Sequence, residues 1–232
     1  MQLSIIYEDK DILVCFKPAG IATQTASLSN PDMVSMIKTY LAKKEQKKSP
    51  YVGVIHRLDQ PVSGLLVFGK NQSASASLSK QIQKEEANKD YIALCAGILK
   101  EREGTLCHYI MKDSVKKMAR VIDADHYVEN MEATYKRASL IYKVEKEMGD
   151  CSIIKVHLQT GRFHQIRAQF CAIGHALLGD GKYCTAESRE LSMKKRINGI
   201  ALCANHLTFR HPVTGKEMEF FLEEKYLPKW YK

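Results

Sequence analysis

The sequence lacks several features that would assign it to common protein classes. No hydrophobic run approaches the roughly 18 residues that a membrane span needs. The first 16 residues carry Glu8, Asp9 and Asp11 and have no long apolar core, so we expect no signal peptide. No C-x-x-C pair, G-x-G-x-x-G turn, phosphate-binding P-loop or spaced set of Cys and His ligands occurs. These absences remove the usual sequence signs of zinc, dinucleotide and nucleotide sites.

The cysteines do not suggest a disulfide framework. There are seven, an odd number, and several lie inside apolar runs such as residues 12–16 and 91–95. Cysteines in such runs are typical of small buried hydrophobic side chains in a reducing compartment. We therefore expect a cytoplasmic protein without disulfides and without a metal site.

Charge and length narrow the choice of partner. The net charge is +9, and 45% of the 232 residues are hydrophobic while 26% are charged. This composition is that of a globular protein whose basic surface suits a polyanion, either nucleic acid or an acidic membrane surface. No repeat, low-complexity tract or linker divides the sequence, so we expect one domain over residues 1–232.

The apolar patterns predict many strands and a few separate helices. Asn30 is expected to cap a helix that buries Met33, Ile37, Tyr40 and Leu41. A second helix is expected from a cap at Asn71 to about residue 86. Alternating residues predict strands near 3–16, 91–99, 106–110, 118–122, 153–159 and 202–222. Strands mixed with separated helices favour an α+β fold with a largely antiparallel sheet.

One polar corner interrupts two strand-like runs, at residues 51–55 and 65–68. Because Pro61 and Gly64 break these runs, Asp59 is expected on a turn where a rigid scaffold presents it. A carboxylate between hydrophobic runs stays ionised only beside a cation or hydrogen-bond donors. Asp59 is therefore either an active-site carboxylate or an ordinary turn residue that binds backbone groups.

A second constellation follows the strand that ends near residue 158. A Thr-Gly turn leads into a helix with Phe163, Ile166 and Phe170 on an apolar stripe. His164 and Arg167 are three residues apart and share a different face. That face is either the wall of a cleft or a solvated basic surface. Arginine there suits both a carboxylate partner and RNA phosphates.

Several segments stand in a distinctive order along nearly the whole chain. The opening Ile6-Tyr7-Glu8-Asp9 and Lys17-Pro18-Ala19-Gly20 come first. They are followed by His56-Arg57-Leu58-Asp59 with Ser63-Gly64-Leu65, Lys89-Asp90-Tyr91-Ile92-Ala93, Leu158-Gln159-Thr160-Gly161-Arg162-Phe163-His164-Gln165-Ile166-Arg167, Leu178-Gly179-Asp180 with Tyr183, and His211-Pro212-Val213-Thr214-Gly215.

This ordered set resembles the signatures of RluA-type pseudouridine synthases. The resemblance implies a single catalytic domain with a mixed, largely antiparallel central sheet, flanked by helices and loops, and an active-site cleft across the sheet. Val62 stands where that family usually has Thr, and Ala176 where it often has Pro. Because the signatures begin near residue 5, we expect no N-terminal S4 RNA-binding domain.

The activity that the resemblance implies is isomerisation of uridine to pseudouridine in structured RNA. Asp59 would be the catalytic carboxylate, acting as nucleophile or as base, and Arg167 would be its ion partner, with Arg162 as second choice. Tyr91 would stack on the uracil and relay a proton, and Arg57 would reach toward the gap that the extruded target leaves in the RNA helix. The residues assigned to substrate binding are Arg57, His56, Arg162, His164 and Leu158.

The same resemblance implies no cofactor and no metal, because the isomerisation involves no redox change or phosphoryl transfer. The partner would be ribosomal or transfer RNA, with no membrane partner, and the protein is expected to be a monomer. Two other functions stay open. A catalytically silent basic RNA-binding module would not need Asp59, and a glycoside hydrolase would need Asp180 as a second acid near Asp59.

Overall fold

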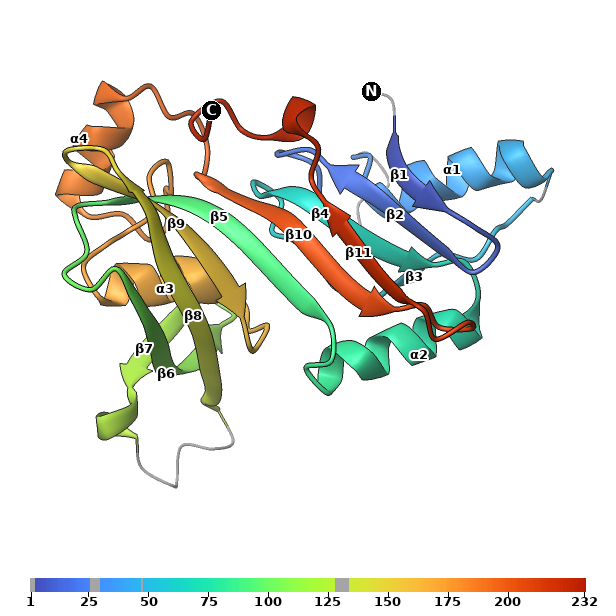
Figure 1. Ribbon diagram of the computed structural model, residues 1–232, viewed down its shortest axis with the longest axis horizontal. Helices are drawn as coiled ribbons and strands as arrows, with labels where there is room; N and C mark the ends of the chain where they lie inside the picture. The colour runs from blue at the N-terminus through green and yellow to red at the C-terminus, as the bar shows by residue number, and fades with distance from the viewer. Residues whose placement is uncertain (1–2, 26–29, 47, 128–133) are drawn as a thin grey trace. The chain divides into compact units, whose positions relative to one another are not determined.

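Figure 1 shows a computed structural model of the chain, which describes residues 3–25, 30–46, 48–127 and 134–232. The chain forms two compact units. The first unit comprises Met1–Lys89 and Ala204–Leu227, and the second comprises Asp90–Cys203 and Pro228–Lys232.

The first unit is built on antiparallel strands. β2 pairs antiparallel with β1 and with β4, β3 pairs with β4, and β11 pairs with β10. The order across the unit is β1-β2-β4-β10. The strands are β1 (Ser4–Glu8), β2 (Ile12–Lys17), β3 (Gly53–Val54), β4 (Ser63–Gly69), β10 (Leu202–Arg210) and β11 (Glu217–Phe221). The turn at residues 211–215 joins β10 to β11, which confirms the predicted hairpin.

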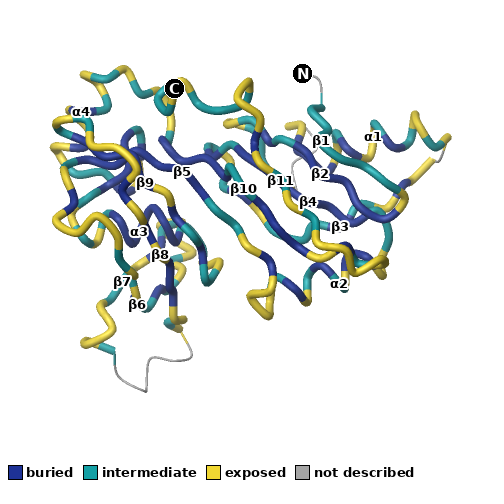
Figure 2. The backbone as a smooth tube through the Cα atoms, in the orientation of Figure 1, coloured by how far each residue is buried: buried dark blue, intermediate teal, exposed yellow. Residues whose placement is uncertain are grey.

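Continuous apolar sequence explains why β2 and β4 lie in the interior of the unit. Residues 12–15 and 65–68 are buried, and Val14 lies opposite Val67 in the ladder. Both strands appear dark blue along most of their length in Figure 2. Buried apolar side chains of this kind are the main favourable contribution to folding. The first unit therefore holds a rigid base under the loop between β3 and β4.

Two helices belong to the first unit. α1 (Met33–Glu45) buries Met33, Ile37 and Leu41, as predicted. Its N-cap is Asp32, whose side chain accepts from the Ser35 N–H, so the prediction of a cap at Asn30 was wrong. The reciprocal Asp32–Ser35 capping box decides the start, because it satisfies two backbone donors at once. α2 (Gln72–Gln83) begins after Asn71, as predicted, and ends before residue 86.

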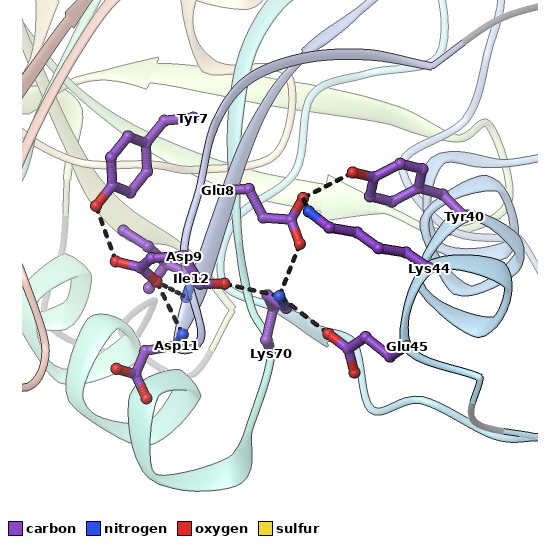
Figure 3. Close-up of polar contacts among 9 residues, drawn as sticks. All are labelled: Tyr7, Glu8, Asp9, Asp11, Ile12, Tyr40, Lys44, Glu45 and Lys70. Atoms are coloured by element: carbon purple, nitrogen blue, oxygen red, sulfur yellow. Dashed lines mark hydrogen bonds and ion pairs between the residues drawn. The ribbon is translucent and has the colours of Figure 1, made fainter.

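A half-buried ionic network ties α1 to the strands (Figure 3). Glu8 accepts from the Tyr40 hydroxyl and from the ammonium groups of Lys44 and Lys70, and Lys70 also pairs with Glu45 at 3.1 Å. Burial alone would raise the pKa of Glu8, but the hydrogen bonds from Lys44, Lys70 and Tyr40 lower it below its ordinary value. The network fixes the last turn of α1 against the end of β1.

The basic run at residues 43–48 is therefore not uniformly available to a partner. Lys44 is already paired with Glu8 at 2.7 Å. Lys43 and Lys48 are exposed, and Lys47 lies outside the described residues.

The second unit is an antiparallel sheet in the order β5-β9-β8-β6-β7. Its strands are β5 (Asn88–Ala96), β6 (Glu103–Asp113), β7 (Met118–Asp123), β8 (Lys136–Glu147) and β9 (Cys151–Leu158). α3 (Gln165–Ala172) packs against β6 and β7. α4 (Ala186–Lys194) was not predicted from the sequence. Short 3-10 turns occur at Ala124–His126 in this unit and at Glu224–Tyr226 in the first unit.

Two clusters of buried side chains lie among the described residues of the second unit. One gathers buried residues of β5 and β9 with Leu178, Leu191 and Ala201. The other packs Ala168 and Tyr183 against buried residues of β6, β7 and β8. Leu191 is the main apolar contact of α4, so a single residue anchors an otherwise polar helix.

The predicted fold class is confirmed. The chain is α+β with largely antiparallel strands and flanking helices. All seven cysteines are free, and burial raises the pKa of Cys95 to about 12. Cys107 is exposed, so burial does not hold for every cysteine. Among the described residues, no helix has the length and hydropathy of a membrane span.

Candidate active site

Asp59 lies on a turn between β3 and β4, as the sequence predicted. The Val62 N–H donates to the Asp59 carbonyl at 3.0 Å, which closes the turn. Asp59 is half-buried, and the neighbouring Gly20 N–H donates to the Gln60 carbonyl at 2.8 Å. The turn is thus held from two sides of the first unit.

The residues around the turn are fixed by unusually complete hydrogen bonding. The Thr23 hydroxyl donates to the Leu58 carbonyl at 3.0 Å and accepts from the Leu58 N–H at 3.1 Å. Gly64 has φ +137°, and a Cβ there would overlap the backbone of Ala204. Only glycine fits such a close approach in that conformation. These contacts explain the positions of Leu58 and Gly64 in the sequence signature.

Lys17 is a buried cation near the Asp59 turn that the sequence reasoning did not single out. It is fully buried at the end of β2, and its ammonium donates to the carbonyls of Pro18, Ile21 and Gln60 at 3.0, 2.6 and 3.0 Å. Burial lowers the pKa of Lys17 to about 8, and the negative charge of Asp59 counteracts part of this. A protonated Lys17 therefore supplies a buried positive charge behind the Asp59 turn at neutral pH.

We expect Lys17→Met to reduce turnover strongly while changing RNA affinity little. Methionine fills similar space but removes the donor to the carbonyls of Pro18, Ile21 and Gln60, of which Gln60 keeps only the Gly20 N–H, so the Asp59 turn loses much of its support. Loss of stability of about 1–3 kcal/mol is expected from the unsatisfied groups. Separate measurement of kcat and KM on an RNA substrate, at a temperature where the variant is folded, checks this. Lys38→Met, at an exposed position of α1, is the matched control. An unchanged kcat in Lys17→Met would show that Lys17 does not position the turn.

His56 lies in the same loop and is held in its neutral form. Its ring is half-buried, and its Nε2 accepts from the Val67 N–H at 3.4 Å. Burial, with a smaller effect from the nearby charge of Lys89, lowers the pKa of His56 to about 3. A neutral imidazole at physiological pH agrees with an orienting role. Arg57, next in the chain, is exposed and accessible to a polyanion.

Tyr91 and Leu158 lie on paired strands of the second unit. Tyr91 is buried on β5, opposite Val156 of β9. Leu158 is the last residue of β9 and is also buried. The two strands therefore place the predicted Tyr91 on a rigid element rather than on a mobile loop.

Arg167 forms a buried bidentate ion pair with Asp180. Its Nε and Nη2 donate to Asp180 Oδ2 and Oδ1 at 2.7 and 2.9 Å, and the two side chains are 4% and 0% exposed. Asp180 also accepts from the N–H groups of Lys182 and Tyr183. Burial alone would raise the pKa of Asp180, but the hydrogen bond and charge of Arg167 lower it. The alternative of a solvated basic face therefore does not hold for Arg167.

Asp180 is thus both a turn residue and the charge partner of Arg167. A carboxylate already bound on both oxygens cannot readily act as a free acid. This arrangement gives no support to the glycoside hydrolase hypothesis.

A short chain of contacts extends from this pair to His164. The Arg167 guanidinium carbon lies 5.1 Å from the Tyr183 ring, and the Tyr183 hydroxyl is 2.9 Å from His164 Nδ1. His164 is half-buried and has the left-handed φ of 54°. Such a conformation is uncommon for a non-glycine residue and is often held by surrounding contacts at functional sites.

The helix begins later than the sequence predicted. α3 starts at Gln165, so Arg162 and His164 precede it and do not share a helix face with Arg167. Gln165 decides the start, because its side-chain oxygen accepts from the Arg162 N–H and the Thr160 hydroxyl. Arg162 is exposed, and its Nε donates to the Arg137 carbonyl at 2.8 Å.

One group has the donor types of a metal site, namely Asp9, Asp11 and His211, with ligand atoms within 4.8 Å of one another. His211 Nε2 is 2.8 Å from Asp9 Oδ2, and its Nδ1 accepts from the Thr214 N–H at 3.1 Å. Asp11 Oδ1 accepts from Asn71. Both imidazole nitrogens are engaged, so the group forms a hydrogen-bonded corner that joins β1 to the β10–β11 turn.

Comparison with known proteins identifies the family. The family model for RNA pseudouridylate synthases matches residues 11–172. The chain is 32% identical to the ribosomal large subunit pseudouridine synthase D of Zymomonas mobilis, over 95% of this chain and 69% of that protein. The chain belongs to the RNA pseudouridylate synthase family. It is therefore an isomerase that converts uridine in RNA to pseudouridine, and the resemblance stated from the sequence is confirmed.

Other relatives agree with this assignment. An uncharacterised RNA pseudouridine synthase of Bacillus subtilis is 32% identical, over 95% of this chain and 68% of that protein. The solved structures of two human proteins, RNA pseudouridylate synthase domain containing 4 and 1, align with TM-scores of 0.76 and 0.73 at 17% and 24% identity. Both cover 98% of this chain, with 90% and 85% of those chains covered. These two structures support the pseudouridine synthase fold.

Proposed function

We propose that Asp59 is the catalytic carboxylate of this pseudouridine synthase and that its substrate is a uridine of large-subunit ribosomal RNA. The turn that holds Asp59 supports the first part, because a half-buried carboxylate beside a buried ammonium stays ionised and oriented. The second part is supported by the names of relatives from Zymomonas mobilis, Buchnera aphidicola and Vibrio vulnificus, each a ribosomal large subunit pseudouridine synthase.

The proposed reaction moves one carbon–nitrogen bond to a carbon–carbon bond. The Asp59 carboxylate acts at the ribose, either as nucleophile at C1′ or as base in a glycal-type route. The N1–C1′ bond breaks and its electron pair goes to the uracil. The detached base turns, C5 bonds to C1′, and the C5 proton is lost while N1 gains one. Product and substrate have the same atoms, so no oxidant or co-reactant is consumed.

Supporting roles follow for the other residues in the signatures. Tyr91 stacks on the uracil and relays a proton, and Arg167 is a further cation, in addition to Lys17, that keeps Asp59 ionised. Arg57 reaches toward the RNA gap that the extruded nucleotide leaves, since a stacked base must leave the helix before its sugar is accessible. Residues proposed to face the RNA are His56, Arg162, His164 and Leu158.

We further propose that the two compact units work as one catalytic domain in a cytoplasmic monomer. The family match over residues 11–172 takes in parts of both units, which supports a single functional domain. The net charge of +9 supports an RNA partner through phosphate contacts that offset the cost of extruding a base.

The target uridine can be found by mapping pseudouridines in RNA. We expect cells without this gene to lose one or more pseudouridines from large-subunit ribosomal RNA. The wild-type gene should restore them, and the Asp59→Asn gene should not. Loss of pseudouridines from transfer RNA alone would overturn the ribosomal assignment and leave the isomerase activity intact.

A further inference from the structure

The second unit contains a cavity that none of the proposed reaction steps uses. Its volume is about 510 Å³, within the range of small-molecule pockets. It is lined by the loop Gly179–Gly181, by one face of α4 and by the turn that follows α4. The residues that line it do not belong to any of the family signatures except Gly179 and Asp180.

Two arginines give this cavity a positive lining. Arg189 of α4 and Arg196 in the turn after it both line the cavity, as does Met193, four residues after Arg189 on the helix. Glu187 and Glu190 fall outside the lining. The carboxylate of Asp180 in the wall is neutralised by its bidentate pair with Arg167. The lining therefore offers two guanidinium groups and no free acid.

Arg196 stands where glycine is usual. The Arg196 N–H donates to the Met193 carbonyl and the Ile197 N–H to the Ser192 carbonyl, which closes α4 with a Schellman motif. Arg196 has φ +53°, a conformation that this motif usually assigns to glycine. Among the described residues Arg196 has no ion-pair partner. Its guanidinium thus remains available to an anion.

The cavity also presents an apolar surface and an amide. Met193 is 68% exposed, although it is a large hydrophobic side chain on a charged helix. A methionine thioether packs well on an aromatic ring. Asn198, in the turn after α4, also lines the cavity and is exposed. Its side-chain amide carries both a hydrogen-bond donor and an acceptor. The arginines suit the phosphate of a nucleotide, the methionine suits the flat face of its base, and the asparagine amide suits the hydrogen-bonding edge of the base.

We propose that this cavity binds one unpaired nucleotide of the RNA substrate, outside the target uridine. Arg189 and Arg196 bind its phosphate, and Met193 packs on its base. Since Asp180 is shared by the cavity wall and the Arg167 pair, the bound nucleotide would set the register of the RNA relative to Arg167. This inference rests on the RNA substrate of the proposed function, but not on the role of Asp59.

Binding of fluorescent RNA at several salt concentrations tests the proposal. The probes are a single strand of about 12 nucleotides and a duplex of the same sequence. Arg189→Gln with Arg196→Gly should weaken single-strand binding about tenfold, the loss expected for charge-assisted hydrogen bonds. The plot of the logarithm of the association constant against the logarithm of salt concentration should become less steep by about 0.7, the value for one phosphate on a single strand. Met193→Ser should weaken binding about threefold without changing this slope.

Two features of the design keep the fold under control. Arg196→Gly places glycine at the left-handed position, so we expect its melting temperature to be unchanged or higher. Arg102→Gln with Lys143→Gln removes the same net charge from exposed positions of the second unit and should retain the wild-type slope. Asp59→Asn should bind the single strand like wild type, so a failure of the catalytic assignment would appear only in turnover.

Three results would overturn the proposal. The first is wild-type affinity and salt slope in the arginine double variant. The second is an equal loss for single strand and duplex, which would indicate general attraction rather than a nucleotide site. The third is binding of a polyglutamate peptide that depends on Arg189 and Arg196, together with RNA binding that does not depend on them. This result would indicate an acidic protein partner.

Discussion

Asp59→Asn is expected to abolish pseudouridine formation and to leave RNA affinity within about twofold of wild type. Asparagine keeps the shape of the side chain and the backbone of the turn, but it is neither a nucleophile nor a base at neutral pH. A loss of at least about 10³-fold in turnover is expected for a residue with this role. Single-turnover reactions with excess protein, followed by nuclease digestion and chromatography, measure the loss independently of binding.

Asp59→Asn also affects the neighbouring Lys17. The charge of Asp59 raises the pKa of Lys17 against the effect of burial, so removing that charge should lower the pKa of Lys17 further. The melting temperature of Asp59→Asn should therefore be compared with wild type before any loss of turnover is attributed to chemistry. Turnover above a tenth of the wild-type rate in the folded variant would remove Asp59 from the mechanism.

Arg167→Met is expected to lose both stability and turnover. The substitution leaves the Asp180 carboxylate buried without its charge partner, and breaking a buried pair in this way costs about 3–5 kcal/mol. Denaturant unfolding and single-turnover kinetics measure the two losses separately.

The double variant Arg167→Met with Asp180→Asn separates structure from chemistry. It removes both charges, and the side-chain carbonyl oxygen of the introduced asparagine can still accept from the Lys182 and Tyr183 N–H groups that Asp180 binds in the wild type. We expect it to regain much of the lost stability, since replacing both members of a buried pair costs far less than removing one. Turnover should stay low although stability recovers. Recovery of turnover together with stability would make the pair purely structural.

The sequence predicted the parts of the fold that local patterns determine. The runs at residues 12–15 and 65–68 predicted interior strands, and Pro61 and Gly64 predicted the turn that holds Asp59. Asn71 predicted the start of α2 because its side chain has one local partner, the Ala74 N–H. These features depend on neighbours within a few residues, so spacing and residue type suffice.

The features that the sequence did not reveal depend on distant partners or weak signals. Lys17 in a Lys-Pro turn is typical of a surface residue, and its burial depends on the carbonyl of Gln60, 43 positions away. Arg167 forms an ion pair with Asp180. The sequence suggested a turn at Asp180 but did not indicate this pair. α4 was missed because Leu191 is its main buried apolar side chain and its capping box uses Ser188 instead of Glu or Gln.

Site residues divide in the same way. The positions of Asp59, Tyr91 and Arg167 were selected through a family resemblance, because no local pattern distinguishes a catalytic Asp from a turn Asp. The apolar spacing of Phe163, Ile166 and Phe170 placed the start of α3 too early. Hydrogen bonds that the Gln165 side-chain oxygen accepts, which periodicity does not detect, place the start at residue 165.

Release of tritium from uracil C5 is the most direct test of the reaction and of its carboxylate. Large-subunit ribosomal RNA transcribed with uridine tritiated at C5 would be incubated with wild-type protein and with Asp59→Asn. Since C5 must lose its hydrogen when it bonds to C1′, the wild-type protein should release one tritium to water for each pseudouridine formed, and the variant should release none. Release by the variant at the wild-type rate would contradict the assignment of Asp59.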